Sequence, residues 1–318
     1  GPPAATPQDR GAGILLYPPS TLAALAPLGA LPWAVAGVAW SLVNISLYGA
    51  TLWALARLGR LRGEWLLLFV AMGLWLAPAT TSIKVGQTGL VVVACMALAA
   101  VWMERCRGVW AGVLMGVGSA IKPQLGLPFI VYHLGRLRWR AGGIAAAILI
   151  AVAALGVARL QMASEAGPVW YASWQRNVHY FQLREDGNPR LENSTYRHHM
   201  LNLHYPLHGF TENRELVNAL VLALVSAASL MYLVIDVRDK SRRGGVWSMG
   251  SVEGGGELLS LSMTAVAGLL VVYHRFYDGV ALLFPMALGA AGLMAGARRH
   301  WVTVAVCALY LVPGPVAL

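Results

Sequence analysis

Long apolar runs, separated by short polar or arginine-containing segments, dominate the chain. A helix needs about 20 apolar residues to cross the hydrocarbon core of a bilayer. The sequence therefore predicts spans at residues 32–55, 65–82, 88–103, 141–160, 216–235, 258–273, 279–297 and 301–317. This pattern is typical of an all-α, polytopic transmembrane helical bundle that forms a single membrane domain over residues 1–318.

Two apolar segments do not fit a single crossing. Residues 20–31 are too short to span, and residues 109–134 are interrupted by Lys122-Pro123-Gln124. Proline lacks a backbone N–H and disfavours helix at the residue before it. We therefore expect two short helices that meet at Lys122. Irregular backbone at membrane depth is tolerated only where it is buried in protein or faces a watery cavity.

The basic residues predict an orientation in the membrane. If the N-terminal loop lies outside, the inner segments hold 14 of the 24 lysines and arginines, in accordance with the positive-inside rule. These are Arg57, Arg60, Arg62, Arg105, Arg107, Arg136, Arg138, Arg140, Arg238, Lys240, Arg242, Arg243, Arg298 and Arg299. The outer face then carries a long extracytoplasmic loop at residues 161–215, and residues 237–257 form a cytoplasmic linker. We expect a multi-pass protein of the plasma membrane.

Composition supports this class of protein. Hydrophobic residues make up 58% of the chain and charged residues 12%, whereas soluble domains carry about 25% charge. The net charge of +10 is spread over short loops, which argues against a nucleic-acid partner. The chain begins with Gly1 in a Pro- and Ala-rich stretch, so we expect a fragment that lacks an upstream first span.

The sequence predicts no metal site. The loop histidines have irregular spacing without a supporting carboxylate pattern, and the cysteines lie far apart. These residues are His179, His198, His199, His204, His208, Cys95, Cys106 and Cys307.

Charged residues at membrane depth are costly and are therefore candidates for function. Lys122 interrupts two apolar half-helices, and Lys84 sits at the outer end of a span, where a lysine can also snorkel to the interface. His274, Arg275 and Asp278 form the densest polar cluster between two spans. This cluster predicts either an Arg275–Asp278 ion pair that stabilises a turn or an anion site, because arginine binds phosphate through its planar fork.

Several motifs in this order resemble family 87 glycosyltransferases, and the resemblance covers most of the chain. The motifs are Tyr17-Pro18-Pro19, Ala26-Pro27-Leu28, Leu31-Pro32-Trp33, Gly86-Gln87, Ala111-Gly112-Val113-Leu114-Met115-Gly116, Ala120-Ile121-Lys122-Pro123-Gln124, and residues 136–140 and 273–278. The resemblance implies a GT-C-like membrane fold and transfer of a hexose, mannose in the best-known relatives, from a polyprenyl-phosphate sugar. It also implies a glycolipid or glycan acceptor at the extracytoplasmic face, inversion, and no metal or other cofactor.

The expected topology places basic residues at the level of a lipid-borne phosphate. Cationic stabilisation of the departing phosphate would then fall to Lys122, His274, Arg275 and Lys84, and acceptor or sugar contacts to Tyr17, Gln87, Gln124 and Tyr277. A carboxylate must take the proton of the acceptor hydroxyl. The candidates are Asp9, Asp278 and, as the resemblance implies, an aspartate upstream of residue 1, without which the chain as given would lack its base.

Two other functions fit the same sequence. A transporter or flippase for a lipid-linked or anionic substrate would also use broken helices and a lysine at mid-membrane. A non-catalytic partner in envelope assembly is the third alternative. A transporter needs accessible charge from both sides, whereas the inner loops here offer mainly anchoring arginines.

Overall fold

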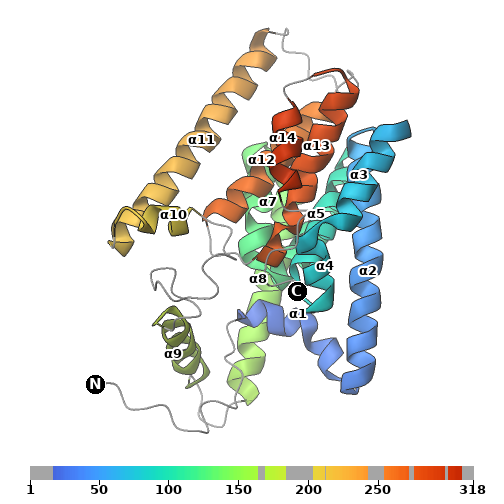
Figure 1. The fold of residues 1–318 in the computed structure, drawn as a ribbon. Helices are drawn as coiled ribbons and strands as arrows, with labels where there is room; N and C mark the ends of the chain where they lie inside the picture. Colours follow the sequence, from blue (N-terminus) through green and yellow to red (C-terminus); the bar gives the residue numbers. More distant parts are fainter. Residues whose placement is uncertain are drawn as a thin grey trace.

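The computed structural model describes residues 17–163, 169–183, 203–211, 213–242, 254–271, 276–297 and 300–309. Within these ranges the chain is helical and has no strand, which confirms the all-α prediction. Figure 1 shows the helices gathered into an elongated bundle, with α11 leaning away on one side.

The helices, in chain order, are α1 (Pro19–Gly29), α2 (Trp33–Leu58), α3 (Gly63–Trp75), α4 (Ala77–Lys84), α5 (Gly89–Glu104), α6 (Gly108–Ile121), α7 (Pro123–Gly135), α8 (Trp139–Ala163), α9 (Val169–Leu183), α10 (His204–His208), α11 (Arg214–Arg242), α12 (Gly254–Val271), the 3-10 helix η3 (Phe276–Leu282), α13 (Leu283–Met294) and α14 (His300–Ala308).

Fewer helices are long enough to cross a membrane than the sequence predicts. Within the described ranges, three pass by length and composition: Trp33–Leu58, Trp139–Met162 and Tyr277–Met294. The span predicted at residues 65–82 is wrong as a single helix, because α3 and α4 meet at a 47° bend and count as a fourth crossing only together. Leu76 is extended at this bend, and Pro78 in the first turn of α4 cannot continue the hydrogen bonding of α3.

The predicted break at Lys122 is confirmed. Helix α6 ends at Ile121, α7 begins at Pro123, and Lys122 between them has φ −144° and ψ 84°. Proline suits the first position of a helix because its missing N–H would have no partner there. The apolar stretch at residues 279–297 also differs from a simple span, since its beginning belongs to the 3-10 helix η3.

Glycines bring α6 into close contact with α8. A Cβ on Gly112 would lie 2.7 Å from the carbonyl oxygen of Ala141, and one on Gly116 would lie 2.7 Å from the Cβ of Ile148. Glycines four residues apart allow such approach in membrane helices, where packing rather than the hydrophobic effect drives association. This contact fixes α6 and therefore the position of Lys122 at its end.

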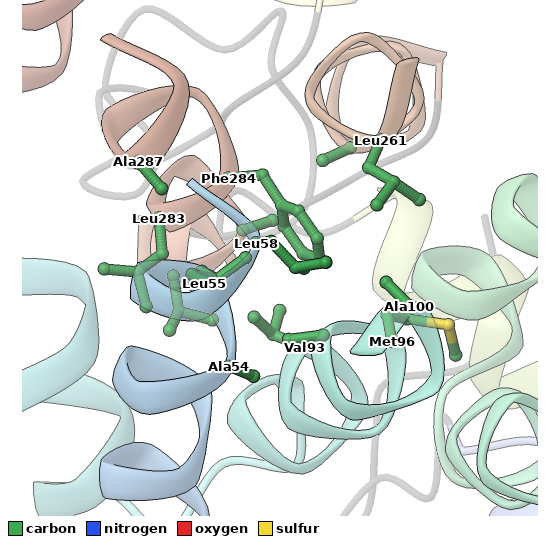
Figure 2. Close-up of a cluster of buried hydrophobic side chains, with 14 of the residues drawn as sticks. Ala54, Leu55, Leu58, Val93, Met96, Ala100, Leu261, Leu283, Phe284 and Ala287 are labelled. Carbon is green, nitrogen blue, oxygen red and sulfur yellow. The ribbon is translucent and has the colours of Figure 1, made fainter. Parts of the chain in front are cut away.

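The core lies between α2, α5, α12 and α13. Figure 2 shows Leu55, Met96, Leu261 and Phe284 converging from these four helices, and each of them is buried. The ring of Phe284 also packs 5.5 Å from that of Phe129 on α7. This core brings early and late helices of the described chain together, and it includes Ile121 and Leu125 on either side of the α6–α7 break.

The two predicted loop segments contain helices. Helices α9 and α10 lie within residues 161–215, and the rings of Tyr171 and Trp174 on α9 stack at 6.2 Å. Helix α11 continues to Arg242 and α12 begins at Gly254, so helix extends into both ends of the predicted linker at 237–257.

Candidate functional site

A buried ion pair occupies the α6–α7 break. Nζ of Lys122 donates to Oδ1 of Asp278 over 2.5 Å, and the two side chains are 6% and 2% exposed. Because Pro123 stops α6 from continuing, the backbone turns at Lys122. Asp278 lies on η3, which packs against α4 and α5. The pair therefore connects the middle of the chain to its C-terminal part.

Burial makes this pair important to the fold and to any chemistry nearby. An isolated charge at this depth would carry a large desolvation penalty, which the opposite charge offsets. Removing one partner of a buried pair costs about 3–5 kcal/mol, because the other charge stays buried alone. A lysine held in this way is a fixed cation in a low-dielectric site, where its attraction for an anion is stronger than in water.

The start of α5 supports the carboxylate of Asp278. Gly89 is the first residue of α5, and a Cβ there would lie 2.6 Å from Oδ1 of Asp278. Only glycine leaves room for this approach. The N-terminus of a helix carries partial positive charge, so it also favours a carboxylate.

An aromatic ring completes the surroundings of the cation. Nζ of Lys122 lies 5.2 Å from the ring centroid of Tyr277, within the range of a cation–π interaction. Tyr277 and Asp278 are adjacent on η3, so one turn of 3-10 helix supplies both the ring and the carboxylate.

Two buried hydroxyls are close in sequence to Lys122 or to Gly89, the residue that contacts Asp278. Oγ1 of Thr88, the residue before Gly89, and Oγ of Ser119, one turn before Lys122, are buried and have no hydrogen-bond partner among the described residues. Buried polar atoms are nearly always hydrogen-bonded in proteins, and exceptions often mark ligand or water sites. These two hydroxyls are polar groups that a substrate could engage.

Two contacts connect the N-terminal helices to the site. The hydroxyl of Thr21 on α1 donates to the carbonyl of Ile121 over 2.8 Å, which satisfies an acceptor at the end of α6. Nε1 of Trp40 on α2 donates to the carbonyl of Gly86 over 2.8 Å in the turn before α5. Both flanks of the pair are thereby held by segments early in the chain.

Five of the predicted site residues meet one another, in two groups. Lys122, Tyr277 and Asp278 come together around the ion pair. Tyr17 and Gln87 also meet, since the hydroxyl of Tyr17 lies 3.5 Å from Oε1 of Gln87. Both of these lie near the ends of elements that border the site, α1 and α5.

Among the described residues, two other candidates, Lys84 and Gln124, are not part of the ion pair. Lys84 is exposed at the end of α4, and Gln124 is half-buried in the first turn of α7. Asp9, His274 and Arg275 lie outside the described residues. Asp278 pairs with Lys122, a distant residue in the chain, while the Arg275–Asp278 pair that the sequence offered as one alternative lies outside the described residues.

Sequence reasoning missed Thr21, Thr88 and Gly89. Thr88 and Gly89 open an apolar run directly after Gln87, which is a helix-start signal that could have drawn attention to them. The role of Gly89 depends on Asp278, however, and nothing local reveals that contact. Within the described part of the chain, no group of three metal-ligating side chains gathers.

Comparison with known proteins relates this geometry to a family. Residues 15–254 match the family described as Glycosyltransferase family 87. The chain is also 28% identical over 152 residues to a polyprenol-phosphate-mannose-dependent alpha-(1-2)-phosphatidylinositol pentamannoside mannosyltransferase of Mycolicibacterium smegmatis. This alignment covers 47% of the chain and 36% of that relative, so the chain spans well under half of the relative's length. No solved structure matches the chain. Lys122 lies inside the family match, and Asp278 lies beyond its end.

Proposed function

Because the chain belongs to glycosyltransferase family 87, we propose that it transfers a hexose, most specifically mannose, from a polyprenyl-phosphate sugar to a glycolipid or glycan acceptor. The name of the relative that shares 28% identity includes both polyprenol-phosphate-mannose, the donor, and phosphatidylinositol pentamannoside, the acceptor. The all-α membrane bundle suits a donor and an acceptor that are both held in a bilayer.

The buried cation Lys122 is the observation that carries this proposal. A polyprenyl-phosphate donor keeps its phosphate near the headgroup level, and the helix break brings a lysine into the protein interior between α6 and α7. Its Nζ is fixed by Asp278 and covered by the ring of Tyr277. Such a preorganised cation stabilises the negative charge of a departing phosphate.

The proposed reaction needs no redox step. The bond between the anomeric carbon and the phosphate oxygen breaks, and the bonding electrons leave with the polyprenyl phosphate. A hydroxyl oxygen of the acceptor forms the new bond from the opposite face, with inversion. A carboxylate takes the hydroxyl proton. The chemistry requires no metal, nucleotide or other cofactor, since the phosphate is already a good leaving group.

Lys122 and Asp278 then act as a unit. When a donor phosphate binds, Lys122 shares its charge between Asp278 and the phosphate, and Lys84, His274 and Arg275 add positive charge at the outer helix ends. Tyr17, Gln87, Gln124 and Tyr277 provide contacts for the sugar or the acceptor. Asp9 and Asp278 are the candidate bases in the chain; the burial and pairing of Asp278 favour a positioning role for it.

We place this reaction at the extracytoplasmic face of the plasma membrane. The placement follows from the arginines of the inner loops and the positive-inside rule. The break at Lys122 lies at the opposite end of α6 from Arg107, which precedes that helix. Cysteine labelling at the exposed residue 84, at the end of α4, from the outside of sealed vesicles tests this placement.

The decisive experiment measures sugar transfer by the full-length protein. Purified protein is incubated with radiolabelled polyprenyl-phosphate-mannose and phosphatidylinositol mannosides, and the labelled glycolipid is counted. Lys122→Ala should lower transfer by at least about 100-fold, in the range of a lost electrostatic contact to the transition state. Arg140→Ala, at the other end of the bundle, should transfer normally. Equal transfer by both variants would remove Lys122 from the site.

A transporter or flippase is the second candidate function. The observation that favours it is the charged pair at a helix break, because discontinuous helices form the substrate sites of many transporters. Vesicles that contain the protein separate the two functions. Movement of a lipid-linked sugar across the bilayer, without any sugar transfer to an acceptor, would support the transporter and reject the enzyme.

A further inference from the structure

An open groove runs between α2 and α3, away from the Lys122 site. It has a volume of about 700 Å³, and apolar side chains from both helices form its walls, including Leu52 and Trp53 on α2 and Leu66 and Val70 on α3. Trp53 is 51% exposed, and Leu67, next to the lining residue Leu66, is 71% exposed. In a membrane protein such an exposed apolar surface faces lipid.

Three arginines also line this groove. Arg57 belongs to the last turn of α2, Arg60 lies in the turn that follows, and Arg62 directly precedes α3. All three are exposed. Among the residues that the structure describes, their side chains have no hydrogen bond or ion pair within the usual distances.

Nearby acids do not neutralise these arginines. Glu104 is near enough that Arg57 and Arg60 act on it: burial raises the pKa of this carboxyl, and the two arginines oppose the rise together with the adjacent Arg105. Glu64 lies in the first turn of α3. Among these described residues, Arg57, Arg60, Arg62 and Arg105 outnumber Glu64 and Glu104.

We propose that the α2–α3 groove binds an anionic phospholipid. The apolar walls accommodate an acyl chain, and the guanidinium groups hold the headgroup phosphate through paired N–H donors. Apolar walls and three exposed arginines at one end match the two halves of a phospholipid. A soluble anion would leave the walls uncovered, and a neutral lipid would leave the arginines without a counter-charge. The site is separate from the sugar-transfer proposal.

The membrane position of the arginines fits this ligand. They belong to the inner segments that the positive-inside rule assigns to the cytoplasm. The cytoplasmic leaflet carries anionic lipids, and each basic residue near its surface contributes about 1 kcal/mol to attraction. The same arginines are also typical of general anchoring to an anionic membrane surface. The test must therefore distinguish a lipid bound in the groove from general electrostatic attraction to the membrane.

Two matched double variants distinguish binding in the groove from general electrostatic attraction. Arg57→Gln with Arg62→Gln removes two charges from the groove. Arg107→Gln with Arg140→Gln removes two exposed arginines that do not line the groove. Arg60→Gly is a third variant that should fold well, because Arg60 has a φ of +50°, a left-handed conformation that glycine adopts without strain.

The measurement is lipid retention by the full chain in detergent, followed by native mass spectrometry. The probes are phosphatidylglycerol, phosphatidylcholine with the same acyl chains, and water-soluble glycerol phosphate. We expect one retained phosphatidylglycerol, little phosphatidylcholine and no glycerol phosphate. The groove double variant should bind phosphatidylglycerol roughly 30-fold more weakly, and Arg60→Gly should also bind it more weakly.

Three results would overturn the proposal. Equal loss of phosphatidylglycerol from both double variants would show only general electrostatic attraction between basic residues and anionic lipid. Equal retention of phosphatidylcholine would show that the arginines select nothing. Binding of glycerol phosphate as tight as that of the lipid would show an anion site without a lipid groove.

Discussion

Nζ of Lys122 and Oδ1 of Asp278 lie 2.5 Å apart although 156 residues separate them in the chain. This contact joins the break between α6 and α7 to the 3-10 helix η3, and both side chains are almost fully buried. It defines the centre of the candidate site and leads to the first prediction.

Breaking the Lys122–Asp278 pair should cost more than replacing it. Lys122→Met and Asp278→Leu should each lower the free energy of unfolding by about 3–5 kcal/mol, because each leaves the other charge buried without its partner. The double variant Lys122→Met with Asp278→Leu should recover much of this loss. Thermal unfolding in detergent, followed by tryptophan fluorescence, measures the effect.

The double variant should still lack sugar transfer, since it has no cation for the phosphate. A stability loss in the double variant equal to the sum of the two single losses would show that the two residues act independently. That result would contradict the coupling that the geometry predicts.

Gly89→Ala should disturb the carboxylate of Asp278. The added methyl group would lie 2.6 Å from Oδ1, so Asp278 or the start of α5 must move. We expect a loss of about 1–3 kcal/mol, as for other overpacked sites, together with weaker donor use. The matched control is Gly37→Ala on α2, where a Cβ meets nothing within 4 Å. Equal behaviour of the two variants in thermal unfolding would be inconsistent with the tight contact at Gly89.

Thr21→Val should weaken the connection between α1 and the end of α6. The substitution keeps the shape of the side chain but leaves the carbonyl of Ile121 without the donor that now lies 2.8 Å away. Loss of such a buried hydrogen bond costs about 1–3 kcal/mol. Because Ile121 precedes Lys122, the KM for the donor should also rise.

Thr51→Val is the control for Thr21→Val. The hydroxyl of Thr51 bonds to the carbonyl of Leu47 within its own helix, so its removal should not reach the site. Donor titrations of sugar transfer compare the two variants. An unchanged KM in Thr21→Val would show that α1 does not position Lys122.

The Arg138–Glu257 pair should make stability depend on pH in the acid range. Arg138 donates to both carboxylate oxygens of Glu257, at 2.5 and 2.9 Å. Burial alone would raise the pKa of Glu257, but Arg138, with His133 and Arg136, outweighs burial and holds the pKa below its ordinary 4.5. Below pH 4.5 the unfolded chain therefore takes up this proton before the folded chain does, and stability falls as pH falls.

Glu257→Gln is the variant that tests this pH dependence. Its stability should be lower than that of the wild type at pH 7, and the difference should shrink as the pH falls through the pKa of Glu257 in the folded protein. Thermal unfolding between pH 7 and pH 3 measures this difference. A constant difference over the whole range would show that the ionised carboxylate contributes nothing.

The sequence by itself determined the membrane class and the break at Lys122. Apolar run length decides whether a segment can lie in a bilayer, and Pro123 disfavours helix at the preceding Lys122 and lacks a backbone N–H. Both signals are local, so no packing information was required. The order of the short motifs likewise indicated the family that the comparison then matched over residues 15–254.

Tertiary structure alone decided which charges meet. No local pattern indicated that Lys122 and Asp278 meet, because 156 residues separate them, yet the fold places Lys122 against this carboxylate. The fold also decided that Gly89 must lack a side chain and that α3 bends into α4. A buried charge is stabilised by whichever opposite charge the packing brings close, and packing depends on contacts between distant segments that no local pattern contains.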